Sequence, residues 1–428
     1  MVNNKDMILP KDPRYRKYPL EEPFDEKKAY WIAFNCSRCS VCKFVDSWRV
    51  KSAKYARICP QHKRYLYDSH SGQGKCDLYR SLYEGKMQWD EDPEIKNILF
   101  QCTMCGGCDA MDKGIRDAEL IKLYRFMRAE YIKRFGPLPE HKAMYDSLKQ
   151  YDNVWLQPRT KRNSWAKDLG IKDLNKEKAE VLFFAGCTYG LSEELKGTVI
   201  TTTKILKKLN IDFGTLGDKE LCCGSPPEKT GLLEEFERLG TANIKQFNAL
   251  GIKTLVTPCA GCYGTIRVEY DELPVKKNFE VLHVSEYLDR LIQDKKLPYK
   301  KEVRKTVTWH DPCHMGRLGR PYAPGKDLEG VYDEPRNILK SIPGIELVEM
   351  ERIKEYAWCC GGGGGAFTGF KDFAQWTARE RLEEAKDTGA AVLATSCPWC
   401  ETNLRAGGIG MDEPMEIANL FDLMMEAL

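Results

Sequence analysis

The 18 cysteines of this 428-residue chain follow two spacing patterns. The first pattern, C-x2-C-x2-C, occurs at residues 36–42 and 102–108, and two more cysteines stand between these triplets, at positions 59 and 76. The second pattern is one cysteine, then an adjacent pair, then C-x2-C, and it occurs at residues 187–262 and 313–400. Repeated thiol spacing of this kind indicates either metal ligands or a disulfide framework, and composition decides between the two.

The composition favours reduced thiols. The chain has 66 lysines and arginines against 63 aspartates and glutamates, and the resulting net charge of +3 does not point to nucleic acid as a partner. The mean hydropathy is −0.50, and the most apolar stretches, residues 181–187 and 390–395, are far shorter than the roughly 20 residues of a membrane span. We therefore expect a cytoplasmic protein without a membrane span, whose thiols stay reduced and bind metal.

The first 179 residues divide into three stretches. Residues 1–30 carry prolines at four positions among many charged residues, so an extended arm is expected there rather than a helix. Residues 31–136 contain both triplets and helical patterning, and a helix over 117–128 would place Leu120, Leu123, Tyr124 and Met127 on one face. Residues 137–179, with further prolines and many charges, predict a linker that wraps the surface.

Residues 180–428 contain an internal repeat, in which the same order of predicted strands and helices occurs twice. In each copy a β-rich run ends at a cysteine, a helix and a strand lead to the adjacent pair, and a second helix (232–250 or 373–388) feeds a strand that ends in C-x2-C. This alternation predicts a helix-covered parallel sheet in each copy, over 180–290 and 291–428. The predicted fold class is α/β with an α-helical N-terminal module, and the cysteines would lie at the carboxyl ends of strands, where such sheets bind ligands.

Each triplet is spaced so that three thiolates from one turn of backbone reach a single cubane [4Fe–4S] cluster, which makes residues 31–136 a ferredoxin-like two-cluster domain. Zinc is the alternative, but zinc sites usually take paired ligands. A bacterial ferredoxin would place its next cysteine at the positions of Asp46 and Asp112. We assign the fourth ligands to the remaining cysteines, without fixing which serves which cluster, and ligation by Asp46 or Asp112 is the alternative. The predicted ligands are Cys36, Cys39, Cys42, Cys59, Cys76, Cys102, Cys105 and Cys108.

The adjacent cysteines of the second pattern favour a cluster over zinc, because sequence neighbours bind neighbouring irons with less strain than one tetrahedral ion. Gly224 and the run of glycines at 361–365 follow the two pairs and let backbone amides approach the sulfurs. This pattern resembles the CCG domain family, which includes catalytic subunits of heterodisulfide reductase and iron–sulfur subunits of glycolate and lactate oxidation systems. With the triplets ahead of it, the chain over residues 31–428 resembles the fused form of heterodisulfide reductase, with electron-relay and catalytic parts in one polypeptide.

The resemblance implies one noncubane [4Fe–4S] cluster for each five-cysteine motif, in addition to the two cubane clusters. The implied ligands are Cys187, Cys222, Cys223, Cys259 and Cys262 in the first motif and Cys313, Cys359, Cys360, Cys397 and Cys400 in the second. The interval after Cys313 is longer than usual for the family, which predicts an inserted loop around 327–337.

Charged and titratable side chains near the second motif have two interpretations each. His310 and His314 flank Cys313 and could serve as general acids for leaving thiolates, or they could hydrogen-bond and pack around the strand end. The cations at 229, 317 and 320 are interpreted as solvated charge, with the binding of an anionic substrate or partner as the alternative.

Two cubane clusters in series predict a path for single electrons, and paired noncubane clusters imply, by resemblance, a site where a small or protein-borne disulfide is reduced to thiols. The alternative is a relay subunit between a flavoprotein, acting on an acyl-CoA or 2-hydroxy acid, and a quinone pool or low-potential acceptor. A zinc-ribbon scaffold or nucleic-acid binder is disfavoured by five-cysteine motifs and near-neutral charge. No G-x-G-x-x-G stands in a strand–helix context. We therefore expect the electron donor to be another subunit, either a membrane cytochrome b type protein, which would hold the chain at the inner membrane face, or a soluble flavoprotein.

Overall fold

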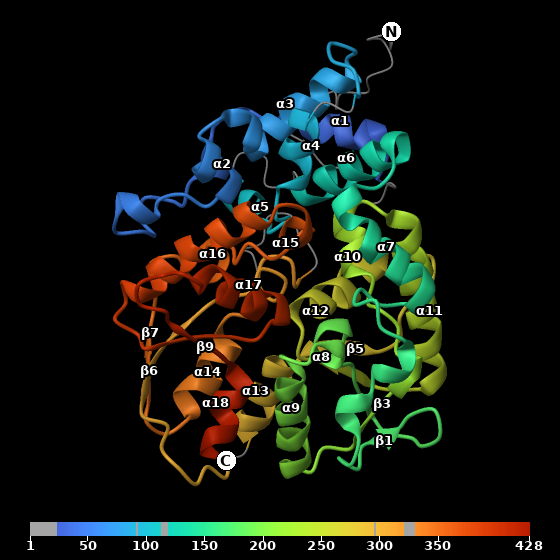
Figure 1. Cartoon of the computed structure of the whole chain (residues 1–428), viewed down its shortest axis with the longest axis vertical. Coiled ribbons are helices and arrows are strands. Elements are labelled where there is room, and N and C mark those ends of the chain that lie inside the picture. The colour runs from blue at the N-terminus through green and yellow to red at the C-terminus, as the bar shows by residue number, and fades with distance from the viewer. Residues whose placement is uncertain (1–23, 91–92, 113–118, 295–296, 321–329) are drawn as a thin grey trace.

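The computed structural model describes residues 24–90, 93–112, 119–294, 297–320 and 330–428. A group of helices forms one end of the molecule, and two α/β halves lie side by side beneath it, the earlier half in green and yellow and the later half in orange and red (Figure 1). Over the described residues, no helix combines the length and the apolar character needed to cross a bilayer.

The helical end contains α1 (Glu26–Asn35), α2 (Pro60–Tyr65), α3 (Gly72–Tyr83), α4 (Pro93–Phe100), α5 (Gly107–Met111) and α6 (Leu120–Phe135). The predicted extended arm is wrong at its end, because α1 begins at Glu26, beyond the last proline of the arm at Pro23. Asp25 caps this helix by accepting a hydrogen bond from the backbone N–H of Lys28 at 2.8 Å. The rest of the arm, residues 1–23, lies outside the described residues.

The amphipathic helix predicted near residue 120 is confirmed as α6. Its four predicted core residues, Leu120, Leu123, Tyr124 and Met127, are all buried. Residues 117–118 of the predicted span lie outside the described residues.

The stretch predicted as a linker, residues 137–179, contains more regular structure than expected. It holds α7 (Pro139–Tyr151), which buries Tyr145 and Leu148, and β1 (Lys172–Asp173). Because β1 pairs in parallel with β3 (Phe213–Thr215), part of this stretch is an edge strand of the first sheet. The high charge of the stretch concealed the short apolar face of α7 from pattern analysis.

The first half is a five-stranded parallel sheet in the order β1-β3-β2-β4-β5. Its remaining strands are β2 (Val181–Phe183), β4 (Thr254–Thr257) and β5 (Glu280–His283). Its helices are α8 (Cys187–Leu191), α9 (Lys196–Lys208), α10 (Ser225–Thr230), α11 (Leu233–Leu250), α12 (Ala260–Arg267) and α13 (Val284–Asp294).

The second half is a four-stranded parallel sheet in the order β7-β6-β8-β9. Its strands are β6 (Lys305–Trp309), β7 (Ile345–Val348), β8 (Val392–Thr395) and β9 (Glu416–Asn419). Its helices are α14 (Asp333–Ser341), α15 (Ala366–Gly369), α16 (Lys371–Lys386), α17 (Pro398–Gly408) and α18 (Leu420–Ala427). Short 3-10 turns lie at Val41–Lys43, Ala53–Tyr55, Asp68–His70, Arg159–Lys161, Ser164–Ala166, Gly217–Lys219, Glu269–Glu272 and Lys354–Tyr356.

The two halves repeat one topology, as the sequence predicted. The order β3-β2-β4-β5 corresponds to β7-β6-β8-β9, and the helices predicted over 232–250 and 373–388 are confirmed as α11 and α16. The loop predicted around 327–337 is wrong in its last part, because residues 333–337 form the first turns of α14; residues 327–329 lie outside the described residues.

The halves pack through a shared core. Helix α13 contacts α14, α9 contacts α18, and one continuous set of buried apolar side chains passes through both halves. Across this contact, the hydroxyl of Tyr189 on α8 donates a buried hydrogen bond to Glu401 on α17 at 2.6 Å. The cysteine-bearing edges of the two sheets are therefore held in one fixed arrangement.

Candidate metal centres

The first triplet surrounds a cavity of about 20 Å³ in the helical end. Cys36, Cys39 and Cys42 come from the loop after α1, and Cys76 reaches the same cavity from α3. A hydrogen bond from Cys76 lowers the pKa of the Cys36 thiol to about 7, so this group is poised to bind metal as a thiolate.

The second triplet surrounds a separate cavity of about 20 Å³. Cys102, Cys105 and Cys108 lie in the segment that leads into α5, and Cys59 joins them from the residue before α2. The sequence did not decide which late cysteine accompanies which triplet, whereas the structure places Cys76 with the first triplet and Cys59 with the second.

The aspartates of the alternative assignment lie differently. Asp112 lines the first cavity beside its four cysteines, whereas Asp46 lines neither cavity. Each cavity is lined by four thiols, so Asp112 is a neighbour of the first set and is not needed as a fourth donor.

Gly72, the first residue of α3, separates the two small cavities and lines both. A Cβ atom at this position would lie 3.2 Å from the Cβ atoms of Cys42 and Cys108 and 3.0 Å from the Tyr124 hydroxyl. An added methyl group would therefore crowd both cysteine sets, whereas glycine lets α3 pass between them without displacing either set. The two sites are therefore close neighbours, with a single backbone segment between them.

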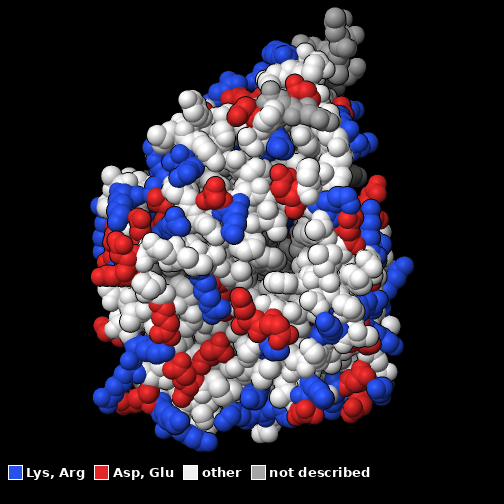
Figure 2. Space-filling view, viewed as in Figure 1, with Lys and Arg blue, Asp and Glu red and all other residues white. Residues whose placement is uncertain are grey.

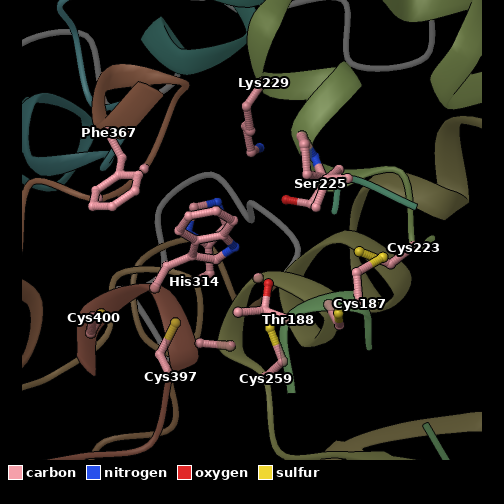
Figure 3. A pocket seen from close by; sticks show the side chains of 18 of the residues that line it. Cys187, Thr188, Cys223, Ser225, Lys229, Cys259, His314, Phe367, Cys397 and Cys400 are labelled. Carbon is pink, nitrogen blue, oxygen red and sulfur yellow. The ribbon is translucent and has the colours of Figure 1, made fainter. Parts of the chain in front are cut away.

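A third cavity, of about 110 Å³, lies between the two α/β halves. A hollow near the centre of the molecule is visible in Figure 2, and the close-up of the cavity shows cysteines converging from both halves (Figure 3). Nine of the ten cysteines in the two five-cysteine motifs line it: Cys187, Cys222, Cys223, Cys259, Cys262, Cys313, Cys360, Cys397 and Cys400. The cavity is therefore bounded by both motifs at once.

The five thiols of each motif lie next to one another in the same order. In the first motif the order runs through residues 187, 222, 223, 262 and 259. In the second it runs through residues 313, 359, 360, 400 and 397. The same order in both halves shows that the repeat extends from the sheet topology to the thiols themselves.

Two thiol contacts connect these sets to one another. Cys259 of the first motif lies beside Cys397 of the second, and Cys105 of the second triplet lies beside Cys359. Cys359 is the one cysteine of the two motifs that does not line the large cavity. The second motif thus contacts both the helical end and the first motif.

Backbone and side-chain N–H groups point at several of these sulfurs. The amides of Gly361 and Gly362 donate to Cys359 and Cys360 at 3.2 and 3.4 Å, which confirms the predicted approach of the glycine run. The buried Arg162 donates to Cys187 at 3.3 Å and pairs with Glu220 at 2.8 Å. Donors of this kind stabilise the negative charge on a metal-bound sulfur.

His310 is fixed by a partner that the sequence did not reveal. Its Nδ1 accepts a hydrogen bond from Nε of the buried Arg381 at 3.2 Å, so the proton of the neutral ring stands on Nε2. Ligand atoms of His310, Cys360 and Cys400 lie within 4.8 Å of one another. This ring is therefore oriented toward the sulfurs of the second motif.

His314 has a different environment. Its Nδ1 lies 3.3 Å from the Cys313 sulfur, and its Nε2 is buried without a hydrogen-bond partner among the described residues. The ring lines the large cavity (Figure 3). Burial alone would lower the pKa of His314, but the adjacent Cys313 raises it above the ordinary value.

The interpretation of residues 229 and 317 as solvated charge is wrong, because both side chains are buried. Lys229 lines the large cavity and binds Glu269 at 2.7 Å and Glu228 at 2.9 Å. Arg317 donates to the backbone oxygen of Cys105 at 3.0 Å, while Arg320 is partly exposed and pairs with Glu286. The sequence carried no signal for these partners, because most of them lie far away along the chain.

The donor sets fit iron–sulfur clusters. Cysteine thiolates are the usual protein ligands of such clusters, and each small cavity is surrounded by four of them. At the large cavity, a Cβ at Gly186 would lie 2.9 Å from the Cys262 sulfur, so glycine keeps space beside the first motif.

Comparison with known proteins defines the class. The family model of the CCG cysteine-rich domain matches residues 181–267 and 307–405, the two repeated halves. The chain belongs to the CCG cysteine-rich domain family and is an iron–sulfur oxidoreductase related to one of the subunits of heterodisulfide reductase.

Three relatives show the range of the similarity. The chain is 32% identical over 406 residues to a dihydromethanophenazine:CoB–CoM heterodisulfide reductase chain of Methanosarcina mazei, covering 92% of this chain and 93% of the relative. It is 28% identical to EtfAB:quinone oxidoreductase of Syntrophomonas wolfei, with 76% of this chain and 45% of that protein aligned. It is 29% identical to a fumarate reductase (CoM/CoB) chain of Methanothermobacter marburgensis, with 77% of this chain and 62% of that protein aligned.

A solved structure of a hypothetical protein from Helicobacter pylori superposes with a TM-score of 0.52 at 11% identity. The superposition covers 94% of this chain and 71% of that one. At this identity the likeness concerns the fold alone.

Proposed function

We propose that the chain holds four [4Fe–4S] clusters and reduces a disulfide in the cavity between its two halves. Two cubane clusters would be held by residues 36, 39, 42 and 76 and by residues 59, 102, 105 and 108, in a relay domain over 31–136. Two noncubane clusters would be held by the five-cysteine motifs, in CCG domains over 180–290 and 291–428, with 137–179 as the connecting segment. The arrangement of these thiols around three cavities supports the assignment.

The clusters supply one-electron transfer when bound. The thiol contacts suggest the order in which the sites exchange electrons: first triplet, second triplet, second motif, first motif. Gly72 separates the first two sets, the contact between Cys105 and Cys359 joins the next two, and the contact between Cys259 and Cys397 joins the last two. Electrons from another protein would thus reach the second motif before the first.

The observation that carries the disulfide proposal is the single cavity lined by cysteines of both motifs. Reduction of RS–SR′ consumes two electrons and two protons and yields RSH and R′SH, so a site reached from two redox centres suits it. In the cavity, the Nε2 of His314 has no hydrogen-bond partner among the described residues, so it can donate a proton to a leaving sulfur. His310 is held by Arg381 beside the sulfurs of the second motif. The Methanosarcina mazei relative is named as a heterodisulfide reductase, which agrees with the proposal.

The test is spectroscopic. Anaerobically purified protein is oxidised and then titrated with candidate thiols while its EPR spectrum is recorded. Binding of a product thiol in the cavity is expected to change the signal of the oxidised protein, and His314→Gln is expected to weaken thiol binding while leaving iron content unchanged. An EPR spectrum indifferent to every thiol would refute the disulfide reaction.

The relay function is the second candidate. The likeness to EtfAB:quinone oxidoreductase favours it, because that protein is named for a quinone and not for a disulfide. A chain that exchanges electrons with a flavoprotein or quinone analogue, but shows no thiol-dependent EPR change, would be assigned to this function.

A further inference from the structure

Access to solvent is unequal among the four thiol sets. All 18 cysteines lie in the described part of the chain, and Cys39 of the first triplet is the only exposed one. The cysteines of the two five-cysteine motifs are buried, apart from a half-buried Cys313. If the sites exchange electrons in the order given above, the first triplet is the end at which electrons pass between this chain and another molecule.

The segment that follows the first triplet along the chain carries large exposed apolar side chains. Phe44 is 40% exposed, Leu66 64%, Tyr67 71% and Trp48 73%, and these four account for most of the exposed large apolar residues of the described chain. We call the surface formed by residues 44–67 the docking face. The blue segment containing α2 lies at the side of the helical end and reaches down toward α16 (Figure 1). Its backbone N–H groups at Lys51 and Ser52 bind Glu351, and Tyr55 binds Asp387, so this segment also contacts the second half.

Contacts at one edge of the docking face lie next to the first triplet in the chain. Phe44 forms a β-bridge with Arg57, whose guanidinium lies over the Phe44 ring at 5.1 Å. Lys43, the next residue after Cys42, binds Asp68 at 2.6 Å beside Tyr67. The docking face therefore begins at the loop that holds the triplet.

The same segment is strongly basic. Residues 36–66 contain eight lysines and arginines and one aspartate, although the whole chain has a net charge of only +3. Four of these cations form ion pairs with carboxylates, whereas Arg49, Lys51, Arg57 and Arg64 form none among the described residues. The positive charge of the chain is thus concentrated where its redox site reaches the surface.

We propose that the docking face binds a protein electron carrier whose own cofactor lies beneath an acidic surface with an apolar centre. The proposal rests on the proposed function in two respects, that the first triplet holds a redox centre and that electrons enter or leave the chain there. Tryptophan, tyrosine and arginine are the residues most enriched at the energetic centres of protein interfaces. Complementary charge also raises the rate at which such partners meet. A protein partner fits better than an anionic membrane, because the face adjoins a redox site and three of its four unpaired cations are arginines.

The test uses a small acidic ferredoxin as the probe and measures how fast it reduces the cluster-loaded protein. The reaction is carried out anaerobically, and the loss of visible absorbance of the clusters gives the rate. The variants Trp48→Ala and Lys51→Glu are compared with Lys204→Glu, which makes the same charge change on the exposed side of α9 in the first half. Trp48→Ala and Lys51→Glu are each expected to slow reduction by about tenfold and, for Lys51→Glu, to flatten its dependence on salt. The Lys204→Glu variant is expected to be reduced by ferredoxin at the rate of the unaltered protein. Dithionite, which needs no docking face, is expected to reduce all variants at equal rates.

Three results would overturn the proposal: equal rates in all variants, equal losses in Lys51→Glu and Lys204→Glu, or binding to phosphatidylserine vesicles that Trp48→Ala abolishes while ferredoxin rates stay unchanged. The assay reads reduction of the clusters and requires no disulfide. If thiols leave the EPR spectrum unchanged while Trp48→Ala and Lys51→Glu still slow reduction by ferredoxin, the disulfide reaction is refuted and the docking face is supported.

Discussion

Replacing Arg128 with methionine should release the helical end from both α/β halves. The guanidinium of this fully buried residue on α6 donates five hydrogen bonds to four backbone carbonyls: Leu99 and Cys102 in the helical end, Lys229 in the first half and Gly364 in the second. The donor–acceptor distances are between 2.6 and 3.1 Å. No carboxylate pairs with the cation among these contacts, and burial lowers the pKa of Arg128 to about 10.

The magnitude follows from the four carbonyls that the variant leaves without a donor. An unsatisfied buried acceptor costs about 1 kcal/mol at the low end of the measured range, so the local opening free energy should fall by about 4 kcal/mol. Native-state hydrogen exchange reports such openings segment by segment. Because each 1.4 kcal/mol is a factor of ten, amides around the four carbonyls should exchange roughly a thousandfold faster in the variant.

The matched control is Arg134→Met on the same helix, whose exposed side chain pairs with Glu130 one turn away. Such pairs contribute about 0.3–0.5 kcal/mol, so exchange should change about twofold or less. If exchange in the Arg128 variant stays within a factor of about five of the unaltered protein, Arg128 does not link the three parts.

Three further predictions concern the thiol sets. Cys76→Ala and Cys59→Ala should each lose about four irons and a different cubane EPR signal, because the two cysteines accompany different triplets. Gly72→Ala should impair both cubane sites at once in iron analysis, since its Cβ would crowd cysteines on either side. Arg162→Gln should lower the reduction potential of one noncubane centre in an EPR-monitored titration, because it removes a charged donor to Cys187. Loss of the same signal in both cysteine variants would contradict the separation of the two small cavities, and full iron content in Gly72→Ala would show that the added methyl group does not disturb the cysteines. For Arg162, the control is Arg159→Gln, a more exposed arginine nearby that pairs with Asp152. Equal shifts in the two arginine variants would show that general charge, rather than the hydrogen bond to sulfur, sets the potential.

Much of the fold could be predicted from sequence because it depends on local patterns. The strands β2, β4, β6 and β8 are short apolar runs that end two to four residues before a cysteine, and the repeat of this pattern predicted two parallel sheets. The apolar face of α6 was visible from helical spacing alone. The strands β5 and β9 were missed, since they follow the last cysteine of each motif and carry mixed polarity.

The rest of the site depends on contacts between distant parts of the chain, for which one sequence has no signal. The choice between Cys59 and Cys76 is made by the path of α3, and the contact of Cys105 with Cys359 spans 254 positions in the sequence. Arg128 and Arg162 look like any other cations in a polar stretch until the fold buries them. The number of cysteines and their spacing therefore predicted the donors, but not the connections among the sites.

Four iron–sulfur clusters held by 18 thiols require a definite metal content, which iron and acid-labile sulfide analysis after anaerobic purification can measure for each chain. We expect a brown protein with about sixteen irons and a similar amount of sulfide. A colourless protein, one with zinc in place of iron, or one with about eight irons or fewer would show that the thiols do not hold four clusters.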